Sequence, residues 1–514
     1  MRYLKFIVLY TTLIIFGGCS AVYIQDLEPK DKVVRADKSS TLLKYFNNRD
    51  KALKNKSAFY SLAKPLDALA SRLFLIDNAK STLDIQYYIF EDDNIGQVFA
   101  THLLLASERG VKVRLLLDDL STAGKDNSIA TLSSHKNIEV KVFNPNRYRN
   151  LFRNVSLVLN LNKLGKRMHN KALIADGVTA IVGGRNIGDV YFASNSETLF
   201  LDYDVLVVGS IMPEINKEFS IYWNSKESKS SSKIISNIDE QSYLEVEKSL
   251  KQDLIKFNQS KFGKALANSK FNKDISRNCL KLTVADKTEL YYDYPSKVST
   301  DEDNTTSHIS SQLSKNITHI DKRVVIISPY LIPSKPMLNA LKKLRDRDVK
   351  VVVVTNSLSS TDVSPVYSGY KEYIKPLLNM GVELYELKPN SFDSQLRDKN
   401  IKKLPSISLH TKMIVIDNKK LIIGSANLDP RSNKLNTELL MIIKSTKLAK
   451  EQNREINSVI NLNNFYRLIL KDDRVFWKTV EDKKIIFYQK EPNTSTLKRC
   501  GVDIMRLLPI KGYL

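Results

Sequence analysis

The chain has 514 residues, of which 42% are hydrophobic, and this excludes a chain too polar to bury sizeable cores. The length suits two large domains with additional segments. The 79 lysines and arginines outnumber the 56 acidic residues and give a net charge of +23. This charge predicts attraction to anionic partners, either lipid headgroups or nucleic acid, and does not by itself separate the two.

The amino terminus has the composition of an export signal. Two basic residues precede an apolar run at residues 6–16, which is too short to span a bilayer comfortably. We predict a signal peptide at residues 1–18; an uncleaved signal anchor is the alternative. Cys19, after two glycines, resembles a bacterial lipoprotein processing site. That resemblance implies a lipid-anchored protein of the bacterial cell envelope, tethered through residues 19–57, with the choice of membrane left open.

The two halves of the chain carry the same order of predicted elements. In each half an apolar, β-branched run leads into a segment of helix length and then into a second strand-like run. These elements lie at residues 83–89, 96–109 and 111–118 in the first half, and at residues 324–330, 335–346 and 349–355 in the second. Strand, helix and strand with continuous apolar runs predict a largely parallel, buried sheet in each half.

Basic and aromatic residues alternate in residues 147–153, just ahead of the first motif described below. Such a segment suits docking at a bilayer interface, where each basic side chain contributes about 1 kcal/mol. A solvated basic loop is the alternative interpretation.

The first motif combines His169, Lys171 and Asp176 in the pattern H-x-K-x4-D, and a turn of small residues then ends in Asn186. A short apolar strand follows the lysine. The two-residue period of a strand places His169 and Lys171 on one face and Asn170 on the other. The histidine and the lysine can therefore converge on one phosphate.

A polar break separates this half from the next. Residues 225–233 are rich in serine, and a predicted amphipathic helix covers residues 239–257. We therefore expect a first domain at residues 58–224, a linker with a helical connector at 225–273, and a second domain with a carboxy-terminal extension at 274–514.

The second motif repeats the first with identical spacing: His410, Lys412 and Asp417, followed by a turn that ends in Asn427. Two copies with the same downstream turn indicate duplication of a whole domain. Paired histidine, lysine and asparagine side chains are what phosphoryl transfer through a histidine requires. Asp417, like Asp176 in the first copy, falls on a turn after the motif strand, where we expect a structural role.

Two H-x-K-x4-D motifs with trailing G-x-x-N resemble the phospholipase D superfamily. Further segments resemble its bacterial cardiolipin synthase branch, especially the type C-like proteins; they are residues 84–88, 183–189, 424–432 and 507–510. The resemblance implies two α/β/α domains about a pseudo-two-fold axis with one shared active site, in a monomer with a pseudo-dimeric core. It also implies catalysis without cofactor or metal, and the sequence contains no His, Cys and Asp cluster at metal-ligand spacing.

Cleavage of a phosphodiester through a histidine needs one neutral histidine as nucleophile and one protonated histidine as acid. By resemblance His169 attacks and His410 is the acid, and the pseudo-symmetry leaves the reverse assignment open. The groups expected to hold the non-bridging oxygens are Lys171, Lys412, Asn186 and Asn427.

Each histidine also needs a carboxylate to fix its tautomer and orientation. Glu438 precedes an apolar strand, and Asp204 precedes one at the equivalent place in the first half. We assign Glu438 to His410 and Asp204 to His169, with Asp202 as the competitor for the latter.

These residues favour a phosphatidyltransferase that acts on phospholipids, with phosphatidylglycerol as the expected substrate, at a membrane surface. A phospholipase D hydrolase and a phosphodiester nuclease are the alternatives, and nucleic acid is the less expected partner. Cys279 and Cys500 could pair in an exported protein or remain as two buried thiols.

Overall fold

The computed structural model describes most of the chain between residues 36 and 508. The described residues are 36–46, 53, 55–149, 152–153, 155–156, 160–194, 198–235, 240–299, 309, 319–391 and 406–508. The predicted signal peptide, the lipidation site at Cys19 and the first part of the predicted tether lie outside them.

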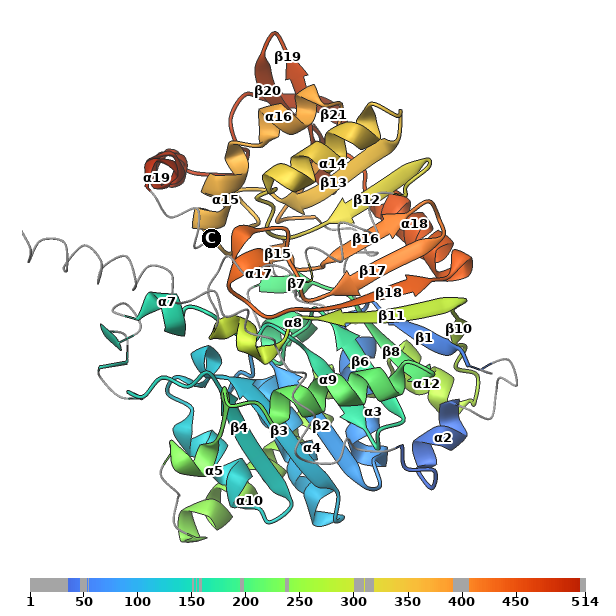
Figure 1. The fold of residues 1–514 in the computed structure, drawn as a ribbon, viewed down its shortest axis with the longest axis vertical. Coiled ribbons are helices and arrows are strands. Elements are labelled where there is room, and N and C mark those ends of the chain that lie inside the picture. The colour runs from blue at the N-terminus through green and yellow to red at the C-terminus, as the bar shows by residue number, and fades with distance from the viewer. Residues whose placement is uncertain are drawn as a thin grey trace, which may run out of the picture.

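Two large mixed sheets, one from each half of the chain, dominate the described residues (Figure 1). The first has the order β10 (Thr283–Val284), β1 (Ser57–Leu62), β8 (Asp204–Gly209), β6 (Thr179–Gly183), β5 (Ala172–Ala175), β2 (Thr82–Tyr87), β3 (Lys112–Asp118), β4 (Ile138–Phe143) and β9 (Ser228–Ser230). The second has the order β11 (Lys287–Tyr292), β18 (Leu439–Lys444), β17 (Lys420–Gly424), β16 (Met413–Ile416), β12 (Arg323–Ile327), β13 (Lys350–Asn356), β14 (Glu383–Leu387), β19 (Phe465–Lys471), β20 (Arg474–Glu481) and β21 (Lys484–Tyr488). The domains therefore repeat one arrangement, as the duplication predicts.

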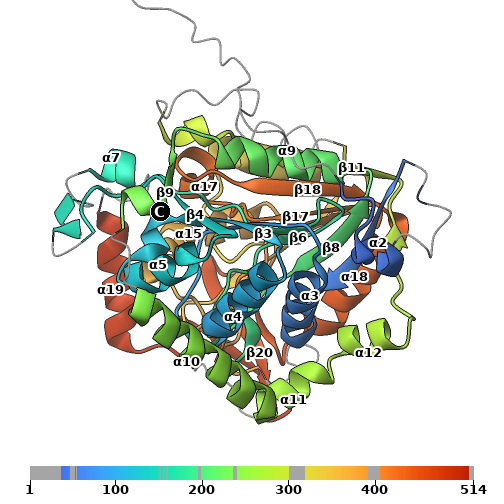
Figure 2. The ribbon, with the colours of Figure 1, turned by 90° about the horizontal axis from the view of Figure 1, so that it is seen from below.

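Helices cover both faces of each sheet, which makes each domain a three-layer α/β/α unit. Figure 2 shows α3 (Pro65–Asn78) and α4 (Asn94–Glu108) on one face of the first sheet and α9 (Met212–Trp223) on the other. In the second domain, α14 (Lys335–Arg345), α15 (Ser364–Lys371) and α16 (Ile374–Asn379) pack on one face and α18 (Thr446–Val459) on the other. The remaining helices used below are α5 (Asp126–Ser134), α7 (Leu161–Leu164), α8 (Asp189–Phe192), α10 (Glu240–Gln259), α11 (Lys261–Ala267), α12 (Lys270–Ser276), α17 (Pro430–Lys434) and α19 (Thr496–Leu507).

The prediction of largely parallel sheets is wrong. Within the two large sheets, as far as the structure describes them, only β2, β3 and β4, and their counterparts β12, β13 and β14, pair in parallel. The motif strands β5 and β16 pair antiparallel with both of their neighbours. The reason is the connection that follows each motif strand, because a tight turn at Asp176 or Asp417 joins only antiparallel strands. A continuous apolar run shows burial on both faces and says nothing about strand direction.

The domain boundary also lies later than the sequence predicts. The serine-rich break contains the edge strand β9, which pairs with β4. The connector helices α10, α11 and α12 pack on α3 and α4 of the first domain, and β10 still belongs to the first sheet. The chain crosses to the second sheet between Val284 and Lys287, because hydrophilic composition at residues 225–233 marks an exposed sheet edge and not a linker.

A hydrophobic core runs continuously through both domains. Side chains of α9 and α18 pack there with strand residues such as Val182 and Val207 from the first sheet and Met413 and Met441 from the second. Close packing of this kind resists relative sliding of the domains. The geometry of any site between them is therefore set by folding.

Cys279 and Cys500 are both exposed and unpaired, so neither the disulfide nor the pair of buried thiols is present. The described residues contain no helix whose length and hydropathy would suit a membrane span.

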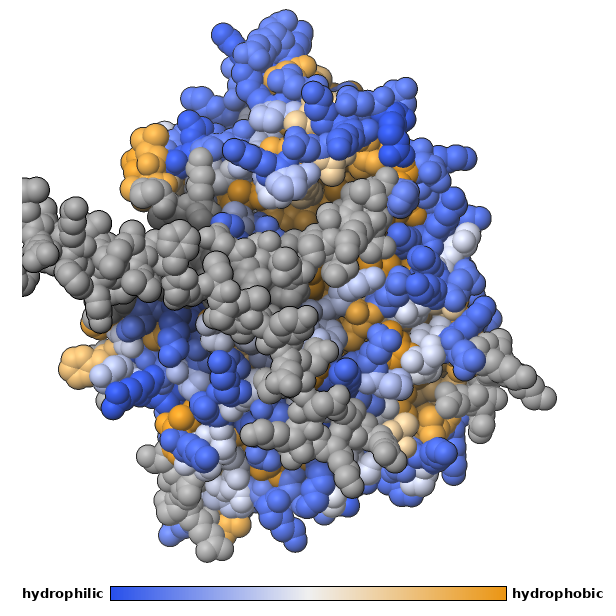
Figure 3. All heavy atoms as spheres, viewed as in Figure 1, coloured by the Kyte–Doolittle hydropathy of each residue, from blue (hydrophilic) through white to orange (hydrophobic). Residues whose placement is uncertain are grey.

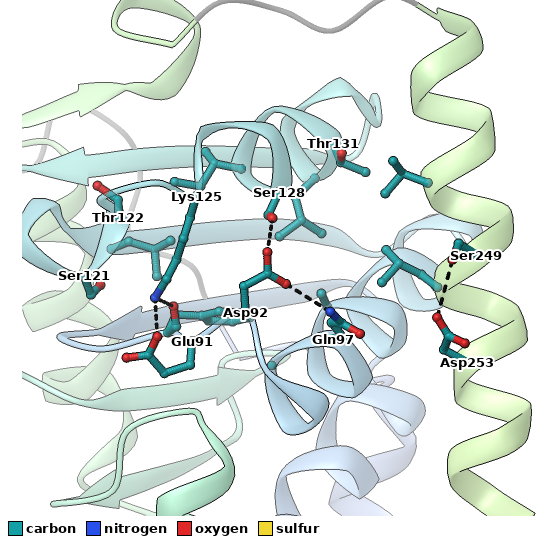
Figure 4. Close-up of a pocket in the computed structure, with 18 residues that line it drawn as sticks. Glu91, Asp92, Gln97, Ser121, Thr122, Lys125, Ser128, Thr131, Ser249 and Asp253 are labelled. Carbon is teal, nitrogen blue, oxygen red and sulfur yellow. Dashed lines mark hydrogen bonds and ion pairs between the residues drawn. The ribbon is translucent and has the colours of Figure 1, made fainter. Parts of the chain in front are cut away.

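A pocket of about 250 Å³ lies between α4, α5 and α10 (Figure 4). Its polar groups bind one another: Lys125 donates to Glu91 at 2.6 Å, and Ser128 donates to Asp92 at 2.5 Å. None of the motif residues lines this pocket. We assign it to the packing of the connector helix on the first domain.

The motif aspartates are structural, as expected. Asp176 accepts hydrogen bonds from the backbone N–H groups of Lys80, Ser81 and Thr82 at the start of β2 and from the Ser40 hydroxyl. Asp417 likewise accepts three backbone N–H groups at the start of β12. Each aspartate ties the motif hairpin to the neighbouring strand.

We therefore predict that Asp176→Ala destabilises the protein by about 3 kcal/mol, because it leaves several buried donors without an acceptor. Asp417→Ala should have the smaller effect, since that carboxylate is more exposed. Urea unfolding checks both. Turnover per folded molecule should remain near wild type, and a selective loss of turnover in Asp176→Ala at unchanged stability would contradict the structural role.

Candidate active site

The structure brings both histidines to the boundary between the domains, each against a carboxylate from the other domain. His169 Nδ1 lies 2.9 Å from Glu438 Oε2, and His410 Nδ1 lies 2.6 Å from Asp202 Oδ2. All four residues are buried, with at most 6% of the surface of any of them exposed. A carboxylate on Nδ1 fixes the imidazole orientation and leaves Nε2 as the reactive atom.

Two short parallel backbone pairings between the domains create these contacts. β7 (Thr198–Leu201) pairs in parallel with β15 (Ser406–Leu409), with Leu201 opposite Leu409, so the next residues, Asp202 and His410, lie side by side. A parallel bridge pairs Met168 with Thr437, so the residues that follow them, His169 and Glu438, also lie side by side. The His410 N–H donates to the Leu201 carbonyl at 2.8 Å, and the His169 N–H donates to the Thr437 carbonyl at 2.9 Å.

The predicted carboxylate assignments are therefore corrected: Glu438 serves His169, and Asp202 serves His410. The strand register explains the error. Gly183 pairs with Asp204, whereas the equivalent Gly424 pairs with Leu440, so the counterpart of Glu438 is Asp202. Residues two apart share a face of a strand, and the sequence pattern alone does not tell them apart.

Asp204 takes part in a buried ion-pair cluster instead. Its carboxylate accepts from the guanidinium groups of Arg72 and Arg185, each at 3.0 Å, and from the Arg185 backbone N–H at 3.1 Å. The second domain has Ala426 and Leu440 at the corresponding positions, so this cluster is specific to the first domain. Asp204 thus stabilises the fold and does not contact either histidine.

The two lysines lie beside their own histidines. Lys171 Nζ donates to the His169 carbonyl at 2.6 Å, and Lys412 Nζ donates to the His410 carbonyl at 2.5 Å. Burial lowers the pKa of Lys171 well below its usual value, and the positive charge of Lys412 lowers it further. Burial also lowers the pKa of Lys412. Two buried cations that disfavour each other form a site that an anion would stabilise.

The histidines and carboxylates respond to the same surroundings. Burial lowers the pKa of His169 to about 4, although Glu438 acts in the opposite direction. Burial also lowers the pKa of His410. Burial alone would raise the pKa of Glu438, but His169 and Lys171 lower it to about 2. A neutral His169 beside an ionised carboxylate is the state that a nucleophile needs at neutral pH.

Aromatic rings surround the imidazoles. Tyr88 packs edge-on against His169 with ring centroids 4.9 Å apart, and the Lys171 ammonium lies 5.3 Å from the same ring. Phe200 stacks on His410 at 5.3 Å, and Tyr191 meets it edge-on at 5.4 Å. None of these rings was predicted to lie at the site. Tyr88 stands two residues after Gln86, the last residue of β2 that pairs with the motif strand β5.

The residue between histidine and lysine points away from the reacting groups, as predicted. Asn170 donates to Glu218 of α9 at 2.8 Å, and Glu218 also accepts from Gln86 at 2.8 Å. The Thr437 hydroxyl donates to the Asn170 side-chain oxygen at 3.1 Å. Asn170 therefore fastens the first motif both to its own domain and to the strand that carries Glu438.

The two motif asparagines differ. The Asn186 oxygen accepts from the Ile89 N–H at 3.1 Å, and its amide donates to the Tyr191 hydroxyl at 2.7 Å. Asn186 therefore has one amide hydrogen left for a substrate. Asn427 has a buried side-chain oxygen that finds no hydrogen-bond partner among the described residues. A buried side-chain amide without a hydrogen-bond partner is suited to bind a phosphate. If the amide group is rotated so that its NH2 takes the place of the oxygen, it donates to a phosphate oxygen.

The two halves also differ in the residue that packs against each carboxylate. The Ser425 hydroxyl donates to Glu438 at 2.5 Å and its backbone N–H is held by the Leu439 carbonyl. The equivalent residue in the first half is Gly184, where a Cβ would come within 2.3 Å of Asp202. Besides its histidine, Glu438 thus accepts from a side-chain hydroxyl, whereas Asp202 accepts from the Tyr203 backbone N–H at 2.8 Å. In the part of the chain that the structure describes, no group of His, Cys, Asp and Glu could hold a metal ion.

Comparison with known proteins places the chain in a family. The family model described as "Cardiolipin synthase, PLD-like domain" matches residues 73–223 and 313–460, one match for each domain. The chain belongs to this family of enzymes. Its relatives include cardiolipin synthase C of Escherichia coli, which is 38% identical over 88% of this chain and 96% of its own length. An uncharacterized protein of Helicobacter pylori is 31% identical over 98% of this chain and 99% of its own length.

A solved structure confirms the fold. Phosphatidylserine synthase of Haemophilus influenzae aligns over 92% of this chain and 99% of its own, with a TM-score of 0.56 at 12% identity. The duplicated α/β architecture predicted from the two motifs is therefore confirmed.

The cross-domain pairing predicts different outcomes for two neighbouring carboxylates. Asp202→Asn should reduce turnover by about 10⁴-fold with little loss of stability, because an amide does not hold the imidazole tautomer that a carboxylate holds. Asp204→Asn should instead destabilise the protein by about 3–5 kcal/mol, because it leaves two buried guanidinium groups without their counter-charge. Steady-state kinetics and urea unfolding on both variants separate the roles, and an exchange of the two phenotypes would restore the assignment of Asp204 to His169.

Proposed function

We propose that this chain is a phosphatidyltransferase of the cardiolipin synthase type, which moves a phosphatidyl group from one phospholipid to the hydroxyl of another through a phosphohistidine. The observation that carries the proposal is the pair of buried histidines, each held by a carboxylate of the opposite domain and each beside a buried lysine. Each domain thus supplies one histidine and one lysine to the same site. Two imidazoles and two ammonium groups suit the binding and cleavage of an anionic phosphodiester.

In the first step, His169 Nε2 attacks the phosphorus atom, and the bond from phosphorus to the leaving alcohol oxygen breaks. His410 donates its Nε2 proton to that oxygen. Lys171 and Lys412 stabilise the negative charge that develops on the non-bridging oxygens. In the second step, the acceptor hydroxyl gives its proton back to His410 and attacks phosphorus, and the bond between phosphorus and His169 breaks.

The electrostatics of the site fit the role of nucleophile for His169 directly. His169, with a pKa lowered to about 4, is neutral at pH 7 and needs no separate base before it attacks. His410 must be protonated to act as acid. A bound phosphodiester adds negative charge near His410 and so favours the imidazolium, while Asp202 stabilises it from the other side.

The acceptor decides between transfer and hydrolysis. Relatives that match most of this chain carry the name cardiolipin synthase, which supports a lipid hydroxyl as acceptor and phosphatidylglycerol as substrate. Anchoring through Cys19 would hold the site at a membrane, where lipid acceptors are concentrated. The hydrolase and nuclease alternatives have no feature of the described residues in their favour over transfer.

The nucleophile can be identified with a phosphatidyl ester of a good leaving group, such as p-nitrophenol, which needs no acid to depart. We predict that His410→Ala still releases about one equivalent of p-nitrophenol per enzyme and then stalls, with the phosphatidyl group on His169. His169→Ala should release none. Mass spectrometry of the quenched protein locates the adduct. An adduct on His410 in the wild-type protein would reverse the two roles.

The acceptor is tested in a cell that lacks its own cardiolipin synthases. We predict that this chain restores cardiolipin and that the His169→Ala variant does not. Purified protein offered phosphatidylglycerol, phosphatidylethanolamine and DNA supplies the matched assay in vitro. Phosphatidic acid without cardiolipin would indicate a hydrolase, and cleavage of DNA with the lipids intact would indicate a nuclease.

A further inference from the structure

The carboxy-terminal helix α19 presents an apolar stripe to solvent. Leu497, Ile504 and Leu507 are 84%, 62% and 80% exposed, and Leu508 directly after the helix is 48% exposed. Leu497 and Ile504 are seven residues apart, a spacing that places both side chains on one face of the helix. Cys500 is exposed as well, at the edge of the stripe beside the hollow that α19 forms with α15 and α16. Four exposed apolar side chains thus gather within one helix and the residue after it, which is more than the single exposed apolar residue that a protein surface commonly has.

The opposite face of α19 attaches it to the second domain. Val502 is 1% exposed, and Asp503 forms an ion pair with Lys371 at the end of α15 at 2.9 Å. A side chain added at Gly501, on the side of the stripe, would meet nothing within 4 Å. The helix is therefore fixed on one side and has no partner within the described residues on the other.

The first domain carries a second exposed apolar surface, in the segment that alternates basic and aromatic residues. Tyr148, Phe152 and Val155 are 48%, 61% and 54% exposed. Two of the arginines in this segment face inward. Arg149 binds Asp119 at 2.7 Å, and Arg153 binds the same carboxylate at 2.9 Å.

These ion pairs change the interpretation of the segment. The sequence suggested that its arginines would meet a bilayer surface. The structure instead pairs Arg149 and Arg153 with the Asp119 carboxylate, while the Tyr148, Phe152 and Val155 side chains are exposed. The part that could enter a bilayer interface is therefore apolar.

Both surfaces lie on one edge of the molecule. Figures 1 and 2 are perpendicular views, and in both α19 and α7, which follows residues 148–155 in the chain, lie at the left. Figure 3 shows hydrophobic atoms at the position of α19 and again lower on the same edge. One surface belongs to each domain, so a single flat partner could contact both.

We propose that α19 and the exposed side chains of Tyr148, Phe152 and Val155 form a docking surface for an anionic lipid bilayer, with the apolar side chains inserted at the boundary between headgroups and acyl chains. Charge supports this partner: α19 carries Lys498, Arg499 and Arg506 against the single, paired Asp503, and the whole chain carries +23. A helix with apolar residues on one face and basic residues beside them is suited to lie in a membrane interface.

The inference rests on the proposed function for its lipid substrate, but it concerns how the enzyme sits on the membrane and not its chemistry. Because both domains would touch the bilayer, the surface would hold the interdomain site in one orientation toward its substrate. The proposed lipid anchor at Cys19 restricts the protein to a membrane without choosing this orientation.

The chain offers its own probes, because it has three cysteines and two of them are exposed. An environment-sensitive fluorophore is attached at Cys500 in the full chain carrying Cys19→Ser and Cys279→Ser. The control carries it at Cys279, beyond α12 at the other edge of the molecule, in Cys19→Ser and Cys500→Ser (Figure 1). On phosphatidylglycerol vesicles with a quencher at the boundary between headgroups and acyl chains, the Cys500 probe should lose most of its emission and the Cys279 probe should not.

Two matched substitutions test the stripe itself. Ile504→Glu should weaken the affinity for vesicles, measured by quenching of the Cys500 probe, by about tenfold or more. The reason is that it replaces an inserted apolar side chain with a charge. Ile485→Glu makes the same chemical change at an isoleucine of similar exposure, 57%, on the β20–β21 hairpin, and should have no effect. Gly501→Leu should strengthen binding, because it extends the stripe into open space.

Different variants test the catalytic proposal and the docking proposal, so one can be contradicted without the other. His169→Ala should bind vesicles like the wild-type protein, and Ile504→Glu should keep wild-type turnover in detergent micelles while losing turnover on vesicles. Equal quenching at Cys500 and Cys279, or equal binding by Ile504→Glu and Ile485→Glu, would overturn the docking surface. A dimer that Ile504→Glu dissociates, without lipid quenching at Cys500, would overturn it in favour of a contact between two copies of this chain.

Discussion

The active site depends on two short parallel backbone pairings between the domains. Leu201 lies opposite Leu409, and Met168 lies opposite Thr437, so the residue after each one meets its partner from the other domain. Neither domain alone contains a histidine with its carboxylate. The shared hydrophobic core fixes these pairings. A complete site therefore needs both domains, because neither motif alone supplies a histidine together with its carboxylate.

Duplication gave the two halves the same reacting groups, but their supports have diverged. Ser425 donates to Glu438, whereas Gly184 stands against Asp202, and no side chain would fit at that glycine. Tyr88 packs on His169, whereas strand register gives Pro329 as its counterpart in the second half. Unequal surroundings are what two histidines need in order to act as nucleophile and acid.

The elements that the two halves share could be predicted from the sequence, whereas the contacts between the two domains could not. The motif spacing and the apolar runs located β5, β16 and their neighbours to within a few residues, and strand periodicity correctly oriented His169, Lys171 and Asn170. The choice between Asp202 and Asp204 depended on a contact with the other domain, for which a single chain has no local signal. Strand direction and the domain boundary were missed for a similar reason, because burial and polarity do not specify which strands are neighbours.

The pairing of each histidine with the carboxylate of the opposite domain is tested most directly by nitrogen NMR of the imidazole rings, which reports tautomer and pKa for each histidine. The account predicts that Glu438→Gln changes the His169 resonances and leaves those of His410 unchanged, while Asp202→Asn does the reverse. A change in His169 on Asp204→Asn, with none on Glu438→Gln, would contradict it.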